Sequence, residues 1–363
     1  SKILQRKIQP RREQPYCWRW SGRAYHPHPV FKSKGTGSST LCAQKQIGER
    51  NDKMSREGLK AVGDNIEKVI VGKRDVIDLI LAAIVAQGHV LLEDVPGTGK
   101  TKLAKALAKS IKGKFSRIQF TPDLLPSDVT GLNYYNQKEG EFRFKPGPVF
   151  CHVLLADEIN RAAPRTQSSL LECMEEKQVT TEGETRKLES PFLVVATQNP
   201  IENAGTFPLP EAQMDRFLMR LSLGMPEREE ELQILERFEK EDPLDTLGAV
   251  TTVEELRRDQ EEYKKVYVHP ELKEYLIDIC ERTRNTGEIL SGVSPRGTIA
   301  LYQAVRAYAY IQNRDFAVPE DIKKLAVPVL SHRLILGGGF AKGDELIARI
   351  LNEIPVPTEE WGR

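Results

Sequence analysis

The chain has 363 residues, of which 39% are hydrophobic and 29% are charged. This is the profile of a soluble globular protein with room for two or three domains. No apolar run approaches the roughly 20 residues of a membrane-spanning helix, so we expect no insertion into a membrane. The five cysteines are scattered and form no Cys-x-x-Cys pair. This pattern argues against a zinc site or a disulfide framework and fits the reducing cytoplasm, where we expect the protein.

Charge is distributed unevenly along the chain. Residues 1–53 contain 12 Lys and Arg against 3 Asp and Glu, whereas residues 54–363 carry a net charge of −8. Trp18 and Trp20 lie among the basic residues, and such a mixture can grip phosphates and stack bases. The segment shows no sustained helical or strand period. We therefore interpret residues 1–53 as a disordered or non-native extension that precedes Met54.

Residues 54–225 alternate between short apolar strands and amphipathic helical patterns, which predicts an α/β domain built on a parallel sheet. The expected strands are His89–Leu92, Ser116–Phe120, His152–Ala156, Phe192–Thr197 and Phe217–Leu221. After the first strand, apolar residues recur at three- and four-residue steps and predict a helix with one buried face. These residues are Leu103, Ala104, Leu107, Ala108 and Ile111.

From residue 226 the strand pattern gives way to helices, several with proline in the first turn. The expected helices are Glu227–Lys240, Pro270–Arg284, Pro295–Gln312 and Pro319–Arg333. They predict a small, all-helical second domain over residues 226–335. A glycine-rich connector and a last helix, Asp344–Ile354, are expected in residues 336–363.

Residues 93–101 read EDVPGTGKT and end like a phosphate-binding loop. They lie between an expected strand and an expected helix, where backbone N–H groups and the helix dipole converge on an anion. Gly97 and Gly99 let the backbone pass close to phosphates. Lys100 can reach the β- and γ-phosphates of a nucleotide, and the Thr101 hydroxyl can bind Mg²⁺.

The usual loop pattern has a glycine where this chain has Asp94. The position stands at the mouth of the turn, where a tight conformation is common but no phosphate contact is made. Asp tolerates turn geometry and can accept hydrogen bonds from nearby backbone amides. The substitution therefore removes no phosphate ligand, although a G-x-G-K-T turn alone is a weak signal.

Two acids follow the third expected strand. Ligands bind at the carboxyl ends of parallel strands, so Asp157 and Glu158 should face the same crevice as Lys100. Asp157 would hold Mg²⁺, directly or through water, and Glu158 would orient the attacking water. The alternative is that both acids cap the helix expected near Pro164.

Polar residues also accompany the later elements. Asn199 follows the fourth strand and could touch the γ-phosphate or its water. Arg216 precedes the fifth strand, and Arg296 opens a helix of the second domain. Either arginine could instead form only a surface ion pair, which for Arg216 would be a pair with its neighbour Asp215.

With these features the chain resembles the MoxR group of AAA+ ATPases over roughly residues 56–355. The resemblance rests on GHVLLEDVPGTGKTKLAKALA, LLADEINRAAPRTQSSLLECMEE, ATQNPIENAGTFPLPEAQMDRFLM, SPRGTIALYQAVRAYA and VLSHRL. The loop of this family usually reads E-D-V-P-G-x-G-K-T, so Asp94 fits the family's own variant. The implied fold is an AAA+ P-loop domain over residues 54–225, followed by a helical lid over residues 226–335.

The resemblance also implies roles for individual residues. The implied catalytic residues are Lys100 of Walker A, Glu158 of Walker B, Asn199 as sensor 1, Arg216 as arginine finger and Arg296 as sensor 2. The implied magnesium ligands are Thr101 and Asp157. The nucleotide would be bound by Val71, Gly72, Pro96, Gly97, Thr98, Gly99, Lys100, Thr101 and Lys102, with the segment Val69–Gly72 packed on adenine. The lid is displaced in this clade, which leaves open whether Arg296 acts on its own subunit's nucleotide.

Two polar stretches that turn at glycines also fit the family. Leu132–Pro146 resembles the helix-2 insert, and Val179–Leu188 resembles the hairpin before sensor 1. Both could equally be plain surface hairpins.

The resemblance implies a Mg²⁺-dependent ATPase that forms a homo-oligomeric ring, expected to be a hexamer, and remodels a partner protein by chaperone-like maturation or metal insertion. The expected client or adaptor has a von Willebrand factor A domain. Two alternatives remain, a nucleic-acid motor related to replicative helicases and a nucleotide-controlled scaffold with little turnover. The negative charge of residues 54–363 and the mixed charges of Thr180–Lys187 argue against nucleic acid. The presence of Glu158 argues against the scaffold.

Overall fold

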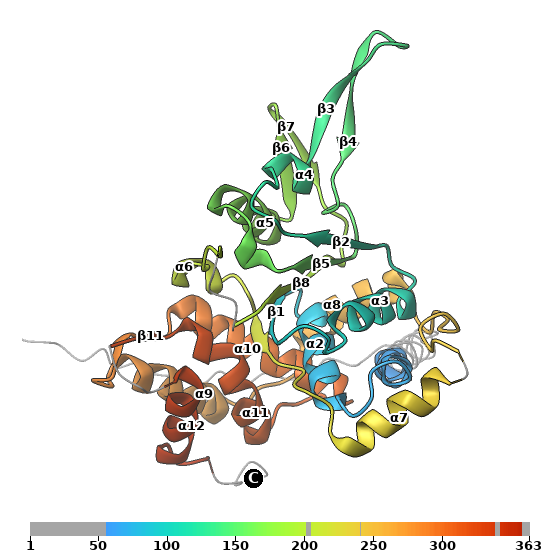
Figure 1. Ribbon diagram of the computed structural model, residues 1–363. Coiled ribbons are helices and arrows are strands. Elements are labelled where there is room, and N and C mark those ends of the chain that lie inside the picture. The colour runs from blue at the N-terminus through green and yellow to red at the C-terminus, as the bar shows by residue number, and fades with distance from the viewer. Residues whose placement is uncertain (1–55, 201–204, 240, 338–341, 358–363) are drawn as a thin grey trace, which may run out of the picture. The chain divides into compact units, whose positions relative to one another are not determined.

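The computed structural model describes residues 56–200, 205–239, 241–337 and 342–357, so the extension expected at residues 1–53 lies outside the described part. Five strands form one parallel sheet in the order β2-β5-β8-β1-β9 (Figure 1). Their bounds are Val90–Glu93 (β1), Phe115–Gln119 (β2), Val153–Asp157 (β5), Leu193–Gln198 (β8) and Met219–Leu221 (β9). Each lies within two residues of its expected position. The predicted α/β fold with a parallel sheet is confirmed.

Alternate residues of the central strands face two different layers of helices. In β5, Val153 and Leu155 belong to the core that contains α2 (Arg74–Val85) and α3 (Lys100–Ser110). Leu154 and Ala156 point the other way, into a core shared with α5 (Pro164–Glu176). All four side chains are fully buried. Burial on both faces explains why this strand is a continuous apolar run in the sequence.

Helices dominate the chain after β9, in agreement with the predicted lid. They are α7 (Arg228–Phe238), α8 (Val253–Glu262), α9 (Pro270–Arg284), α10 (Pro295–Ile311), α11 (Pro319–Leu330) and α12 (Gly343–Glu353). The described part of this region also holds one antiparallel strand pair that was not expected, β10 (Ile289–Ser291) with β11 (Ile335–Leu336). The domain boundaries after residues 53, 225 and 335 stay predictions.

Helix α8 was not predicted because only two of its ten residues, Val253 and Leu256, are apolar. Its start nevertheless carries a capping box. The Thr252 hydroxyl accepts a hydrogen bond from the Glu255 N–H (3.2 Å), and the Glu255 carboxylate accepts one from the Thr252 N–H (2.9 Å). The T-x-x-E pattern at 252–255 was therefore the available sequence signal.

Two antiparallel hairpins extend from one end of the sheet (Figure 1). They are β3 (Gly131–Asn136) with β4 (Glu141–Pro146), and β6 (Gln178–Thr181) with β7 (Glu184–Lys187). The Asn133 amide donates to the Glu182 carboxylate (2.8 Å), and the Arg186 guanidinium lies 3.9 Å from the centre of the Phe144 ring. The two expected hairpins are thus present and touch each other. Their family identities stay predictions.

Among the described residues, no helix is long and apolar enough to cross a membrane.

A buried histidine links the sheet to α5. His89 Nδ1 accepts a hydrogen bond from the Val194 N–H (3.0 Å), and Nε2 lies 3.1 Å from the Met174 carbonyl oxygen. The first contact needs an unprotonated Nδ1, so the ring is neutral with its proton on Nε2. Burial lowers the pKa of His89 to about 4.

We expect this histidine to make stability fall in mild acid. An unfolded chain protonates His89 below about pH 6.5, whereas the folded chain takes up that proton only near pH 4. Stability is therefore fully present above pH 6.5 and declines by about 3 kcal/mol as the pH falls to 4. Urea unfolding of the wild type and of His89→Gln across this range measures the effect. The variant should show a shallower decline, and equal slopes for the two proteins would contradict the assignment.

Candidate functional site

The loop between β1 and α3 owes its shape to two glycines. Gly97 has φ +93° and Gly99 has φ +91°, both in the left-handed region that favours glycine. A Cβ on Gly97 would meet no atom within 4 Å, so the conformation, rather than a lack of space, demands glycine there. Gly99 is the N-cap of α3. The free N–H groups and positive dipole end of this helix therefore face the loop, as an anion site requires.

Asp94 anchors the start of this loop. Its side chain is buried and accepts hydrogen bonds from the Ser222 hydroxyl (2.7 Å), the Leu223 N–H (2.9 Å) and the Gly224 N–H (3.0 Å). The carboxylate was expected to bind backbone amides, but these amides belong to the segment that follows β9. Asp94 therefore fastens the loop to the chain that leads into α7.

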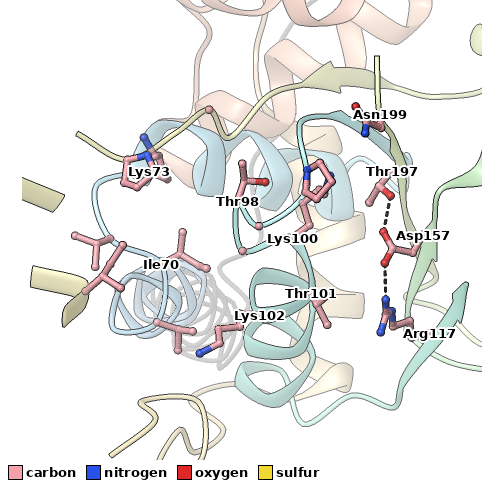
Figure 2. Close-up of a pocket in the computed structure, with 18 of the residues that line it drawn as sticks. Ile70, Lys73, Thr98, Lys100, Thr101, Lys102, Arg117, Asp157, Thr197 and Asn199 are labelled. Carbon is pink, nitrogen blue, oxygen red and sulfur yellow. Dashed lines mark hydrogen bonds and ion pairs between the residues drawn. The ribbon is translucent and has the colours of Figure 1, made fainter. Parts of the chain in front are cut away.

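The loop borders a cavity of about 590 Å³. Figure 2 shows that its walls come from the loop and α3 on one side and from the ends of β2, β5 and β8 on the other. The lining residues are Val69, Ile70, Val71, Lys73, Pro96, Gly97, Thr98, Gly99, Lys100, Thr101, Lys102, Arg117, Gln119, Asp157, Glu158, Thr197, Asn199, Gly224, Pro226 and Ile234. The volume suits a nucleotide-sized ligand.

Lys100 lies folded over the loop mouth. Its ammonium donates to the carbonyl oxygens of Asp94 (2.8 Å) and Val95 (3.3 Å). These are neutral acceptors, and a phosphate group would offer the ammonium stronger, charge-assisted hydrogen bonds. The side chain is thus placed beside the loop that would hold the phosphates.

Asp157 is held between two neighbours at the end of β5. Its carboxylate accepts a hydrogen bond from the Thr197 hydroxyl (2.6 Å) and pairs with the Arg117 guanidinium (2.7 Å), as Figure 2 shows. Arg117 also donates to the Gln119 side-chain oxygen (2.8 Å). The carboxylate therefore already faces a positive charge on the cavity wall.

Glu158 adopts a left-handed backbone conformation, with φ +57°, which is uncommon outside glycine and marks a constrained position. Its N–H donates to the Thr197 hydroxyl (2.9 Å). Its carboxylate accepts hydrogen bonds from the Gln119 amide (2.8 Å) and the Arg161 guanidinium (2.9 Å). Glu158 is therefore oriented by residues of three different elements. Neither Asp157 nor Glu158 provides the N-cap of α5, which is Ala163.

Arg216 and Arg296 lie outside the cavity. Both reach the same carboxylate, that of Glu175 on α5, with Arg216 Nε at 3.2 Å and Arg296 Nη1 at 3.0 Å. The ion pair weighed as the alternative for Arg216, with Asp215, does not form. Asp215 instead pairs with Arg333 (2.6 Å), and its carboxylate also lies 3.8 Å from Arg296 Nε.

The chain is similar to known protein families and to individual relatives along most of its length. Residues 89–219 match the ATPase family associated with various cellular activities (AAA), and residues 281–354 match the AAA lid domain. The uncharacterized protein YeaC of Bacillus subtilis is 50% identical over 304 residues, covering 83% of this chain and 95% of its own length. The chaperone MoxR1 of Mycobacterium tuberculosis is 40% identical over 306 residues, covering 80% of each chain.

A crystal structure of a candidate ATPase from Cytophaga hutchinsonii superposes with a TM-score of 0.81 at 40% identity, covering 87% of this chain and 99% of the other. The chain belongs to the MoxR family of AAA+ ATPases. It is an ATPase of a nucleotide-binding family. The predicted family, fold and enzyme class are confirmed.

The MoxR site gathers most of the residues that sequence reasoning assigned to it. Eight of the nine expected nucleotide-binding residues line the cavity, and so do Asp157, Glu158 and Asn199. Gly72 is absent from the lining. It has φ +71°, and a Cβ there would lie 1.7 Å from a carboxylate oxygen of Glu230 on α7. The individual roles of these residues stay predictions.

Sequence reasoning missed several residues of the MoxR site. Arg117 and Gln119 project from β2 towards Asp157 and Glu158, and Thr197 bridges these two acids. The available signal was the alternation in β2, where polar 117 and 119 flank the buried Ile118. At the end of the cavity that Val69–Val71 line, Lys73 pairs with Glu230 (3.1 Å), which brings α7 to this end.

We expect Asp94→Ala to weaken both the fold and nucleotide binding. The change leaves one buried and one half-buried backbone N–H group and one hydroxyl without their acceptor, which lowers the free energy of unfolding by about 1–3 kcal/mol. The loop also loses its anchor. Urea unfolding and titration with a fluorescent ATP analogue measure the two effects, and Asp94→Asn, which keeps one acceptor oxygen, should lie between. An unchanged unfolding midpoint in Asp94→Ala would contradict the anchoring role.

Proposed function

We propose that this chain is a Mg²⁺-dependent ATPase that works as a homo-oligomeric ring, expected to be a hexamer, and couples ATP hydrolysis to the remodelling of a partner protein. The separation of the catalytic groups within one chain carries this proposal. Lys100, Glu158 and Asn199 line the cavity, whereas Arg216 and Arg296 converge on Glu175 outside it. A neighbouring subunit that supplies these arginines would complete the site.

The residues of the cavity can divide the reaction among them. Lys100 exchanges its two carbonyl acceptors for phosphate oxygens when ATP binds. Glu158, held by Gln119 and Arg161, accepts a hydrogen bond from the attacking water and sets its line of approach. Asn199 adds a polar amide at the end of β8, where the γ-phosphate and this water would meet.

The residues present also fit Mg²⁺. Thr101 and Asp157 both line the cavity and offer the hard oxygen donors that this ion prefers. The Arg117 guanidinium on Asp157 indicates that a positive charge is favourable at this point. No group of three or more His, Cys, Asp or Glu side chains is arranged as a metal site within the described ranges. Phosphate oxygens and water would supply the other ligands, and bound Mg²⁺ would neutralise charge on the β- and γ-phosphates.

Two observations support a partner protein, namely the name of a relative and the exposed aromatic residues of the β3–β4 hairpin. The mycobacterial relative is named a chaperone, and we extend a chaperone-like role to this chain. The β3–β4 hairpin exposes Tyr135 and Phe142, whose rings stack edge to face at 5.4 Å. Exposed aromatic residues of this kind are typical of protein contacts. A protein with a von Willebrand factor A domain is the client or adaptor that the family resemblance favours.

We expect Lys100→Ala and Glu158→Gln to separate binding from turnover. Lys100 would touch bound phosphate, so its loss should abolish binding of a fluorescent ATP analogue. Glu158 would touch only the water, so Glu158→Gln should bind the analogue as the wild type does and lose ATP turnover. Hydrolysis by Glu158→Gln near the wild-type rate would show that another residue orients the water.

We expect Arg216 to act on the neighbour's nucleotide. Arg216→Ala should keep ATP affinity and lose about 10³–10⁵-fold in turnover, the usual effect of removing an arginine finger. Mixing Arg216→Ala with Lys100→Ala subunits should restore part of the activity, because some interfaces then combine an intact loop with an intact arginine. Arg282→Ala, which removes another Arg–Glu pair (2.8 Å, with Glu353), is the matched control and should keep full turnover. No recovery in assemblies whose mixing is verified independently would count against a role between subunits.

A further inference from the structure

Arg333 lies at the end of the short helix η3 (Ser331–Arg333) and holds the chain segment that carries Arg216. Its Nε donates to the Asp215 carboxylate (2.6 Å), and its Nη2 donates to the Phe217 carbonyl oxygen (2.7 Å). Its Nη1 donates to the Leu218 carbonyl oxygen (3.2 Å). One guanidinium thus fixes three of the four residues from 215 to 218, on both sides of Arg216 in the chain.

The same side chain also supports the segment that carries Arg296. Gly297 is the next residue in α10, and a Cβ there would lie 2.9 Å from Arg333 Cδ. The first turn of α10 therefore packs directly on the stem of Arg333, with no room for a side chain between them. Asp215 completes the link, because it pairs with Arg333 and also lies 3.8 Å from Arg296 Nε.

The arginines of the two segments that Arg333 contacts lie at the same carboxylate, that of Glu175. Arg216 comes from the chain before β9 and Arg296 from the helical region, 80 positions later. Both guanidinium groups end on the Glu175 carboxylate, at 3.2 Å and 3.0 Å. Arg333 contacts both the segment that carries Arg216 and the first turn of α10, which carries Arg296.

Arg333 itself cannot meet a ligand. Its side chain is only 3% exposed, against 30% for Arg216 and 47% for Arg296, and it does not line the nucleotide cavity. Burial lowers its pKa, an effect that the Asp215 carboxylate opposes. Any influence of Arg333 on the reaction must therefore pass through the groups that it holds.

We propose that Arg333 is a positioning residue that sets Arg216 and Arg296 as one unit for the nucleotide of the neighbouring subunit. The proposal rests on the proposed function, since it supposes that these arginines act between subunits. A Lys at this position keeps the charge but carries all its N–H donors on one nitrogen, so it cannot span the separate acceptors of Asp215, Phe217 and Leu218 as the planar guanidinium does. A finger misplaced by about 1 Å loses on the order of 10²-fold in rate.

The first part of the test compares turnover and binding in the assembled full-length protein. Arg333→Lys should lower kcat by about 10²-fold, with the affinity for a fluorescent ATP analogue unchanged. Arg314→Lys is the matched control, because Arg314 likewise pairs with a carboxylate, that of the buried Asp321 (2.5 Å), but lies outside this network. We expect it to lower the melting temperature and to keep kcat. If Arg333→Lys does not fold, Gly297→Ala, which pushes on the Arg333 stem, takes its place in the same comparison.

The second part mixes Arg333→Lys with Lys100→Ala subunits. Arg333→Lys subunits keep an intact loop, so activity should recover where a Lys100→Ala neighbour supplies well-placed arginines. A merely structural role would give no recovery. Wild-type kcat in Arg333→Lys, a fall in nucleotide affinity that matches the fall in kcat, or no recovery where Arg216→Ala recovers would each overturn the proposal and leave the proposed function standing. Failure of Arg216→Ala itself to recover would instead overturn the proposed function.

Discussion

Parallel pairing of β5 with β8, and of β8 with β1, is the constraint on which the site depends. Ala156 is the register partner of Ala196, and Leu92 is the partner of Thr197, so the three strands end at one edge of the sheet. Residues 40 and more positions apart in the chain are thereby neighbours. The short side chain of Thr197 can reach Asp157 at 2.6 Å only because the strands are adjacent and in this register. A slip of one residue would turn these side chains to the opposite face.

The same edge of the sheet is connected to the helical region through Asp94. The loop residue that departs from the common glycine pattern binds Ser222, Leu223 and Gly224, which follow β9 and precede α7. The ion pair between Lys73, which lines the cavity, and Glu230 connects helix α7 to the other end of the cavity. A movement of α7 would therefore be transmitted to both ends of the cavity. Glycine in place of Asp94 would keep the turn but lose this connection.

The sequence predicts those parts of the molecule whose signals are local. Buried strands appear as apolar runs, and Lys100, Asp157 and Glu158 follow such runs at fixed offsets, so their elements could be located within one or two residues. The loop conformation was likewise predictable, because Gly97 and Gly99 are needed for positive φ values. Helix α8 was less accessible because it has few apolar residues, although its capping box was readable.

Contacts between distant segments could not be obtained in this way. The order of strands in a parallel sheet is not local, so nothing in β2 alone says that Arg117 and Gln119 will meet Asp157 and Glu158. Asp215 gives the clearest case. It is adjacent to Arg216 in the chain and was considered its partner, yet its carboxylate binds Arg333, 118 positions later. Neighbours in sequence point in different directions, and only the tertiary fold decides which charges meet.

The pairing of two arginines with one carboxylate has an energetic consequence for assembly. Arg216, Arg296 and Glu175 are each between 30% and 47% exposed, so each ion pair contributes at most about 1 kcal/mol to stability. The Glu175 carboxylate is thus shared between two guanidinium groups. An arginine finger lowers an activation barrier by about 4–7 kcal/mol, several times the stability of either pair. If the arginines act on a neighbour's phosphates as proposed, the transition state gains more than the loss of either pair with Glu175 costs. The half-buried Asp215–Arg333 contact need not break in this process, because neither of its residues pairs with Glu175.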